Sequence, residues 1–255
     1  MEVGEGIVTA VSTTALSAVA TWERGLMAWL NQVALDLPAL DAFLVRLAGS
    51  DLAKGVAVMA VIWWLWFAGR DDESPERMRA RLLVVAIGSS VATLLGRSLQ
   101  LVLPQRFRPL HDEALAMRLP YGFEAAGVEG WNSYPSDHAA LFVALAVGIA
   151  TVHRKVGLTL LGYVICFILL PRVFVGLHYP TDLLLGGVIG ATCIVGAVFA
   201  FERSAQIERL LSLERTRPAL FYACFFVFTT QVATLYDGAR ALAGYAKDVL
   251  ALFGG

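Results

Sequence analysis

The stretch 134–182, YPSDHAALFVALAVGIATVHRKVGLTLLGYVICFILLPRVFVGLHYPTD, contains two of the four histidines of the chain, His138 and His178. Each of them lies close to a proline, at the edge of a long apolar segment. Apolar segments of about 20 residues are typical of helices that span a lipid bilayer. The stretch therefore predicts membrane-spanning helices with a group of polar residues gathered at one of their ends.

The composition favours the same class of protein along the whole chain. Hydrophobic residues make up 58% of the 255 residues and charged residues only 16%, whereas a soluble domain carries about 25% charged residues. The apolar runs do not alternate as the strands of a membrane barrel do, and no basic stripe suggests that nucleic acid is a partner. Three cysteines, Cys166, Cys193 and Cys224, lie inside apolar runs, so we interpret them as core residues.

We predict an all-α, polytopic membrane protein built as a six-transmembrane-helix bundle. The six predicted spans lie near 52–69, 82–103, 138–152, 156–174, 181–201 and 218–236. They form one domain at 51–237, with an N-terminal region of amphipathic interfacial helices at 1–50 and an amphipathic tail at 238–255. Pro38 breaks the N-terminal region, and a spanning helix within 7–35 remains an alternative for part of it.

The arginines and lysines of the short loops predict the orientation. Loops 70–81, 153–157 and 202–217 hold most of them and share one side of a six-span bundle, which we assign to the cytoplasm. Loop 104–137 and turn 171–180 then share the opposite side. All the polar fragments of interest therefore fall on the periplasmic or exterior face of what we expect to be a bacterial inner membrane.

His178 and Asp182 are four residues apart, and Pro180 between them suits the first turn of a helix. A carboxylate at this spacing can reach the imidazole, fix its tautomer and stabilise the imidazolium. His178 could then present its other ring nitrogen as a nucleophile. The alternative is an interfacial histidine beside an aspartate that only caps the helix.

His138 begins another predicted helix, directly after Ser136 and Asp137. A helix N-terminus offers free N–H groups to an anion, although Ser136 could equally be an ordinary cap. Arg108 and Arg172 each adjoin a proline at a membrane edge. Two guanidinium groups bind phosphate oxygens well, and snorkelling to lipid headgroups is the alternative for each of them.

Together these residues predict phosphoryl transfer without a metal or other cofactor. One histidine would attack phosphorus and the other would protonate the leaving oxygen. His178 and Asp182 alone are too few ligands for zinc or magnesium.

Three motifs resemble those of the type-2 phosphatidic acid phosphatase superfamily: R-P at 108–109, P-S-D-H at 135–138 and R-x5-H-x3-D at 172–182. The family patterns are K-x6-R-P, P-S-G-H and S-R-x5-H-x3-D. The resemblance implies that His178 is the nucleophile that becomes phosphohistidine, Asp182 its orienting partner and His138 the general acid. It also implies a phosphate cradle made of Arg108, Arg172, Ser136 and the backbone at Asp137.

The chain departs from the family patterns at three positions. The lysine falls at Leu101, the glycine at Asp137 and the serine at Pro171. Arg97 lies about one helical turn before Leu101 on the same face, so we predict that it completes the phosphate cradle. A salt bridge to another helix or a snorkelling anchor is the alternative for Arg97, and Arg106 is a second candidate for the missing cation.

The leading hypothesis is a membrane phosphatase, a hydrolase of the cell envelope, acting at the outer face on a lipid phosphate or diphosphate. We favour a polyprenyl carrier such as undecaprenyl phosphate or its diphosphate, with phosphatidylglycerol phosphate and phosphatidate as alternatives. A non-catalytic lipid-binding relative differs from it in a phosphatase assay. A transporter would be expected to carry more charges deep in its spans than Arg97 alone, and the predicted spans disfavour a vanadium haloperoxidase.

Overall fold

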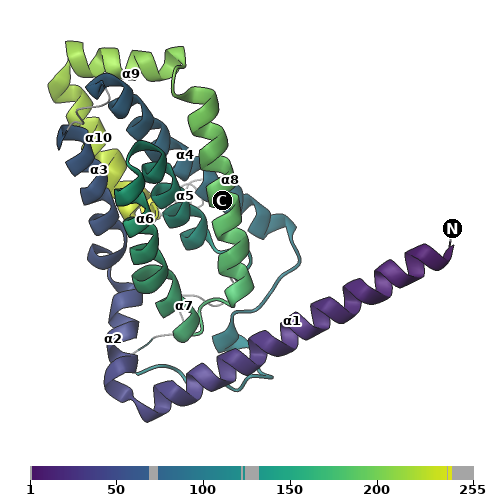
Figure 1. Ribbon diagram of the computed structural model, residues 1–255. Helices are drawn as coiled ribbons and strands as arrows, with labels where there is room; N and C mark the ends of the chain where they lie inside the picture. The colour runs from purple at the N-terminus through teal and green to yellow at the C-terminus, as the bar shows by residue number, and fades with distance from the viewer. Residues whose placement is uncertain (1, 69–73, 122, 124–131, 240, 243–255) are drawn as a thin grey trace, which may run out of the picture.

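The computed structural model describes residues 2–68, 74–121, 123, 132–239 and 241–242. In this part of the chain the regular structure is entirely helical (Figure 1), which confirms the predicted all-α class. The α-helices are α1 (Glu2–Asp36), α2 (Pro38–Gly49), α3 (Ala57–Ala68), α4 (Pro75–Val102), α5 (Asp137–Val152), α6 (Arg154–Tyr163), α7 (Leu170–Phe174), α8 (Pro180–Phe201), α9 (Ala205–Thr216) and α10 (Pro218–Ala233). Two π-helices, η1 (Leu52–Val56) and η4 (Val164–Leu169), and a 3₁₀ turn, η2 (Pro109–His111), complete the set.

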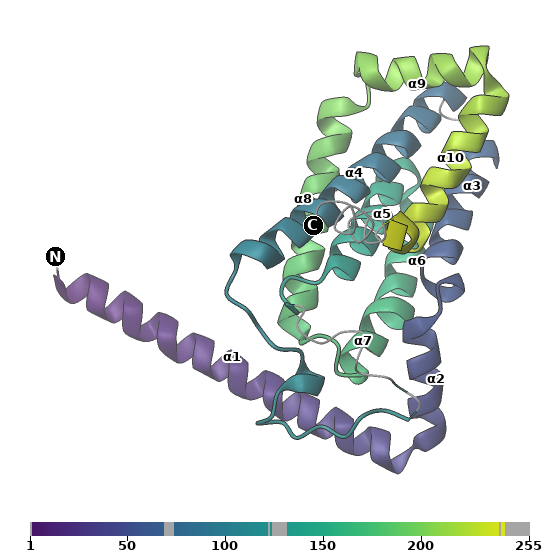
Figure 2. The same cartoon turned by 180° about the vertical axis from the view of Figure 1, so that it is seen from behind.

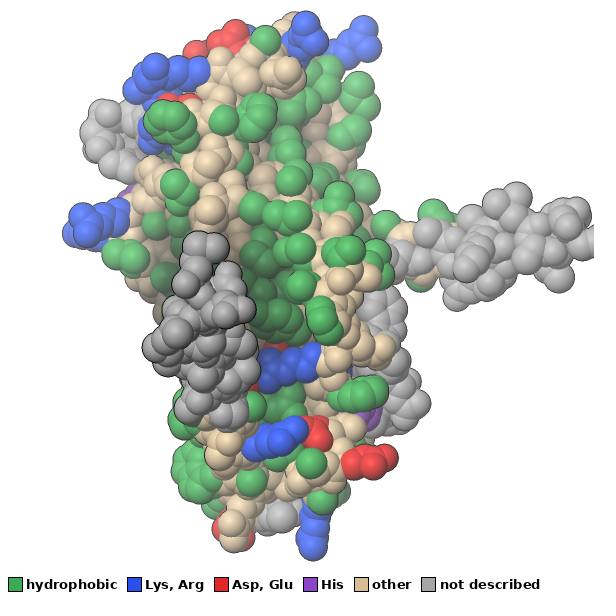
Figure 3. Space-filling model, turned by 90° about the vertical axis from the view of Figure 1, so that its right-hand side faces the viewer, with side chains coloured by type: hydrophobic (Ala, Val, Ile, Leu, Met, Phe, Trp, Pro, Cys, Tyr) green, Lys and Arg blue, Asp and Glu red, His purple; other side chains and the backbone are tan. Residues whose placement is uncertain are grey.

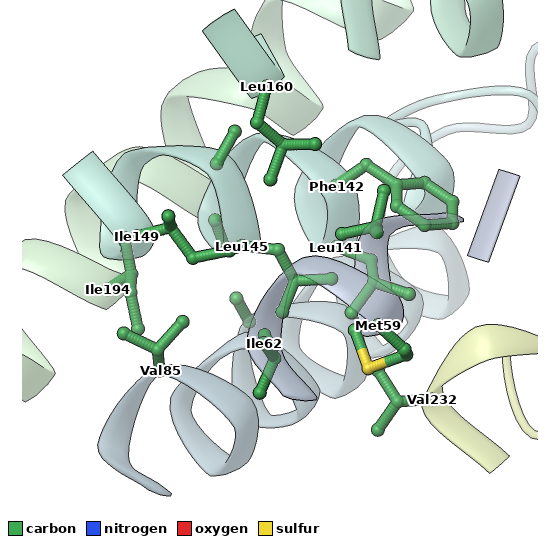
Figure 4. Close-up of a cluster of buried hydrophobic side chains, with 14 of the residues drawn as sticks. Met59, Ile62, Val85, Leu141, Phe142, Leu145, Ile149, Leu160, Ile194 and Val232 are labelled. Atoms are coloured by element: carbon green, nitrogen blue, oxygen red, sulfur yellow. The ribbon is translucent and has the colours of Figure 1, made fainter. Parts of the chain in front are cut away.

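Helix α5 is the centre of the bundle and packs against α4, α6 and α8. Its side chains Leu141, Leu145 and Ile149 are fully buried, and Figure 4 shows them among apolar side chains that include Val85 of α4 and Ile194 of α8. Between helices in a bilayer, close van der Waals packing replaces the hydrophobic effect as a main source of association. The dense apolar core therefore fixes where α5 begins, and α5 begins at the polar motif 135–138.

Two glycines bring the backbones of α5 and α8 into contact. A methyl group at Gly186 would lie 2.3 Å from the carbonyl oxygen of Ser136, and one at Gly190 would lie 2.2 Å from that of Ala140. Small residues at such positions allow two helices to approach closely. The N-termini of the two helices are thereby held side by side, which places both histidine motifs at one end of the bundle.

Apolar helices long enough to span a bilayer confirm a helical membrane protein. Within the described residues they are Pro75–Val102, the continuous segment Arg154–Phe174 and Pro180–Phe201, and α2 with the η1–α3 segment forms a pair bent by 67° that could be a fourth span. The apolar helices α5 and α10 have 16 residues each and are shorter. Every predicted span thus coincides with an apolar helix, while the number six stays a prediction.

The N-terminal region contains a single 35-residue helix, α1, followed by α2 from Pro38. The chain breaks at the predicted proline, because Leu37 before it is held out of the helical region at φ −129° and ψ 69°. Figure 1 shows α1 leaving the bundle at the end where α7 and α2 lie. An interfacial location of this region, and the division into three parts, stay predictions. The predicted tail 238–255 lies largely outside the described residues.

Ion pairs gather the predicted cytoplasmic loops at the other end of the bundle. Arg79 pairs with Glu214 at 2.7 Å, Arg81 pairs with Glu202 at 2.7 Å, and Arg81 also donates to the carbonyl oxygen of Thr151. Helix α9 lies across this end (Figure 1), and Figure 3 shows apolar side chains between charged groups at both ends. The side of a membrane that each end faces stays a prediction.

Candidate active site

Backbone hydrogen bonds join the three sequence motifs at the N-termini of α5 and α8. The Ser136 amide donates to the carbonyl oxygen of Asp182 at 3.0 Å, and the Ser133 amide donates to that of Arg106 at 3.0 Å. Ser136 is the N-cap of α5, and its hydroxyl accepts from the Ala139 amide. The site is therefore built on two helix starts and on the loop that precedes α5.

His178 is buried, and its two ring nitrogens have different partners. Nδ1 lies 3.0 Å from the carbonyl oxygen of Ser133, and Nε2 lies 3.4 Å from the hydroxyl of Ser136. A carbonyl oxygen can only accept a hydrogen bond, so the neutral ring carries its proton on Nδ1. Nε2 consequently holds a lone pair, and the Ser136 hydroxyl is the group that can donate to it. The Asp182 carboxylate lies 3.7 Å from Nδ1, farther than the Ser133 oxygen.

The surroundings of His178 keep its imidazole neutral. Burial lowers the pKa of His178 below its ordinary value of 6.5, and the positive charges of Arg108 and Arg172 add to this effect. The Asp182 carboxylate acts in the opposite direction and raises the pKa. The net result is an unprotonated ring at neutral pH, the form that can act as a nucleophile.

Asp182 is fixed by a network that reaches into α1. Its Oδ2 accepts from the Tyr179 amide at 2.8 Å, and its Oδ1 accepts from Arg106 at 2.7 Å. Arg106 also donates to Thr181 at 2.8 Å and to Glu23 of α1 at 2.6 Å, and its guanidinium lies 4.0 Å from the centre of the Tyr179 ring. Glu23 is only 2% exposed and also accepts from the amide and hydroxyl of Thr181.

His138 has an aspartate and an arginine of its own. Asp137 Oδ1 lies 2.8 Å from Nδ1 of His138 and accepts from the His138 amide, while Oδ2 accepts from Arg97 at 2.7 Å. The Nδ1 contact leaves Nε2 of His138 for a substrate. The structure therefore places Arg97 in the salt bridge that the sequence offered as the alternative, and phosphate binding by Arg97 stays a prediction.

Two arginines present donors that the protein leaves unused. Arg108 donates through Nη1 to the carbonyl oxygen of Leu177 at 3.0 Å, and Arg172 is 6% exposed. In both side chains Nε is buried and has no hydrogen-bond partner among the described residues. Buried donors without partners are costly unless an anion accepts from them, so this is a suitable place for phosphate oxygens.

The described residues contain no group of three or more His, Cys, Asp or Glu side chains placed to hold a metal ion. Leu101, at the position of the family lysine, is 89% exposed. Arg106 lies on the Asp182 side of His178, where its donors are engaged by carboxylates.

Two groups of the site were missed by sequence reasoning, Ser133 and Glu23. Ser133 contributes a backbone carbonyl, which leaves no signal in a sequence. Glu23 lies in the region 1–50, which sequence reasoning treated only as amphipathic. Its acidic side chain one helical turn from apolar residues on both sides, such as Val19 and Met27, was the available signal.

Comparisons with known proteins agree with these motifs. The chain is 27% identical over 143 residues, 55% of its length and 65% of the relative's, to "Putative undecaprenyl-diphosphatase YbjG" of Escherichia coli (strain K12). It is 35% identical over 86 residues, 32% of its length and 40% of the relative's, to "Bacitracin transport permease protein BcrC" of Bacillus licheniformis. The chain thus spans less than two thirds of the length of either relative, and no solved structure matches. The profile of the PAP2 superfamily matches residues 79–206, half of the chain, and so the chain belongs to the PAP2 superfamily.

Proposed function

We propose that this protein is a membrane lipid phosphatase that hydrolyses a lipid phosphate or diphosphate through a phosphohistidine. The observation that carries the proposal is the unprotonated Nε2 of buried His178, whose ring proton is held on the opposite nitrogen by the Ser133 carbonyl. Membership of the PAP2 superfamily and the similarity to a relative named as an undecaprenyl-diphosphatase support it.

In the first step Nε2 of His178 attacks phosphorus. The new N–P bond forms as the bond from phosphorus to the leaving oxygen breaks. The leaving oxygen takes a proton from Nε2 of His138, and the Asp182 carboxylate stabilises the positive charge on His178. Arg108 and Arg172 compensate the charge of the transferred phosphoryl group, and donors fixed in advance are effective in this role.

In the second step water attacks the phosphohistidine. His138, now neutral, takes a proton from that water while its oxygen bonds to phosphorus and the N–P bond breaks. Phosphate leaves, and both histidines return to their starting protonation states. No metal ion takes part in this scheme.

An apolar groove beside the site supports a lipid substrate. It has a volume of about 860 Å³ and is lined by residues of α1, α5, the α6–α7 segment and α8. Pro171 and Pro180 are part of its lining, and they stand one residue before Arg172 and two residues after His178. A lipid chain in this groove would place its phosphate at the site. A polyprenyl carrier at the outer face of a bacterial inner membrane is our preferred substrate.

The test is phosphate release by the purified full-length protein across a set of lipids. The set contains undecaprenyl phosphate and diphosphate, phosphatidylglycerol phosphate and phosphatidate, each assayed with and without EDTA. We expect turnover that EDTA does not abolish and that vanadate inhibits. A protein that binds these lipids but releases no phosphate from any of them would instead be a non-catalytic relative.

A further inference from the structure

Lys54 is a buried cation outside the segment that matches the family. It lies in the π-helix η1, ahead of residues 79–206, and its side chain is 9% exposed. Lysine is almost never buried unless it is paired. Its salt-bridge partner among the described residues is Asp51, at 3.2 Å, whose side chain is half exposed. This contact at the protein surface compensates the buried charge only in part.

The neighbours of Lys54 belong to the candidate site. Its ammonium interacts electrostatically with Arg172, with Asp137 and with His138. Of the buried polar and charged side chains described, Lys54 and Arg172 are the cations. Two like charges buried within range of each other repel, and an anion placed between them would remove the repulsion.

The backbone around Lys54 is held firmly by other helices. A methyl group at Gly55 would lie 1.7 Å from the carbonyl oxygen of Ala233 in α10, and the Tyr163 hydroxyl donates to the carbonyl oxygen of Ala53. Figure 2 shows the α2–α3 column, which contains η1, close to α10. Because η1 is fixed on both sides, the backbone position from which the Lys54 side chain extends is fixed.

The other candidates for the missing family lysine are engaged elsewhere. Arg97 is paired with Asp137, and Arg106 bridges Glu23 and Asp182. Lys54 has no second carboxylate at salt-bridge distance among the described residues. Of Arg97, Arg106 and Lys54, it is therefore the cation with the most capacity left for a substrate anion.

We propose that Lys54 binds the leaving phosphate when the substrate is a lipid diphosphate, and so sets the preference for diphosphate over monophosphate. Lys54 and Arg172 both lie within electrostatic range of His138, the proposed acid. A second phosphate held by Lys54 would therefore lie beside the phosphate that Arg172 binds. The leaving group of a lipid monophosphate is an alcohol, which is neutral once protonated. The leaving group of a lipid diphosphate is a charged lipid phosphate, so a cation beside it stabilises the transition state for the diphosphate more than the one for the monophosphate. This inference rests on the proposed function.

The test compares Lys54→Met with the wild type on the monophosphate and the diphosphate of one polyprenol. We expect kcat/KM for the diphosphate to fall by about 10²-fold, the size typical of one lost electrostatic contact. For the monophosphate the fall should stay below about threefold. Lys54→Arg should keep most of the diphosphate activity, and the matched control Lys155→Met, on an exposed lysine at the opposite end, should change neither rate.

A binding measurement decides the inference even if no lipid is turned over. Inorganic diphosphate and orthophosphate are titrated onto both proteins, with thermal unfolding used to confirm that Lys54→Met folds. We expect the variant to bind inorganic diphosphate about tenfold more weakly, a difference of about 1.4 kcal/mol, with orthophosphate binding nearly unchanged. Equal losses for both ions, or no loss for either, would overturn the role of Lys54. Absence of turnover by the wild type would overturn only the proposed function.

Discussion

His178 and His138 each stand beside an aspartate that an arginine contacts, yet the two arrangements differ in geometry and in burial. Asp182 is completely buried and lies 3.7 Å from Nδ1 of His178, behind the closer Ser133 carbonyl. Asp137 is 14% exposed and contacts Nδ1 of His138 directly, at 2.8 Å. A ring held mainly by a neutral carbonyl suits a nucleophile. A ring in direct contact with a carboxylate suits a group that must carry a proton.

The two arginines repeat this difference. Arg106 bridges two carboxylates that are both almost completely buried, Glu23 and Asp182, at 2.6 and 2.7 Å. Arg97 contacts one carboxylate, Asp137, at 2.7 Å and is 23% exposed. Asp137, which stands at the position of the family glycine, therefore gives His138 an orienting carboxylate of its own.

The largest expected effect on turnover comes from replacing each histidine with alanine. His178→Ala should lower kcat by about 10⁴-fold or more, because the nucleophile itself is lost. His138→Ala should cost about 10² to 10⁴-fold, the usual contribution of one general acid. Single-turnover assays with labelled substrate should trap an acid-labile phosphoenzyme in wild type and in His138→Ala but not in His178→Ala. Phosphoenzyme in His178→Ala but not in His138→Ala would reverse the assignment, and equal phosphoenzyme in all three proteins would exclude both histidines as the nucleophile.

Replacing the two aspartates should lower kcat/KM by different amounts, and replacing Asp182 should also change its pH dependence. Asp182→Asn should lower kcat/KM by about 10²-fold or more and Asp137→Asn by about tenfold, since Asp182 also stabilises the charged nucleophile. The folded-state pKa of His178 is already lowered, so the active neutral form is lost only as the pH falls below 6.5. Asp182→Asn removes the cause that raises this pKa, so the acidic limb of kcat/KM should move to lower pH. A shift of this limb to higher pH would contradict the prediction.

The smallest expected effect on turnover is that of Arg97→Gln, a loss of about three- to tenfold, because Arg97 acts only through Asp137.

Arg106→Gln leaves two buried carboxylates uncompensated, which typically costs about 3–5 kcal/mol of stability. Thermal unfolding in detergent compares the two variants. Glu23→Gln combined with Arg106→Gln should be more stable than Arg106→Gln alone. If Arg97→Gln instead abolishes turnover in a folded protein, Arg97 binds phosphate directly, as the sequence first suggested.

Local sequence predicted the parts of the site that depend on local structure. The proline and aspartate around His178 predicted the start of α8, and Ser136 is the N-cap of α5, as one interpretation of the motif expected. The apolar runs predicted where the membrane helices lie, and the motifs predicted the family. These features depend on residues a few positions apart.

The partners of the catalytic groups could not be predicted, because they come from distant helices. Glu23 and Arg106 are 83 residues apart in the chain, and their contact exists only because α1 packs under the start of α8. Lys54 drew no attention in the sequence, since its role depends on how η1 packs between α10 and α6. The missing lysine at Leu101 directed the sequence prediction to two arginines close to it in the chain, Arg97 on the same helix and Arg106 just after its end, rather than to a residue of another helix.

The bridge between Glu23 and the start of α8 has a consequence for biosynthesis. Glu23 belongs to α1, and its partner Thr181 is synthesised 158 residues later. Contacts so distant in sequence form late. A nascent chain that ends at α7 therefore lacks both His178 and its aspartate. Under the proposed function, the growing polypeptide is unable to act on a lipid phosphate until α8 has been made and docks against α1.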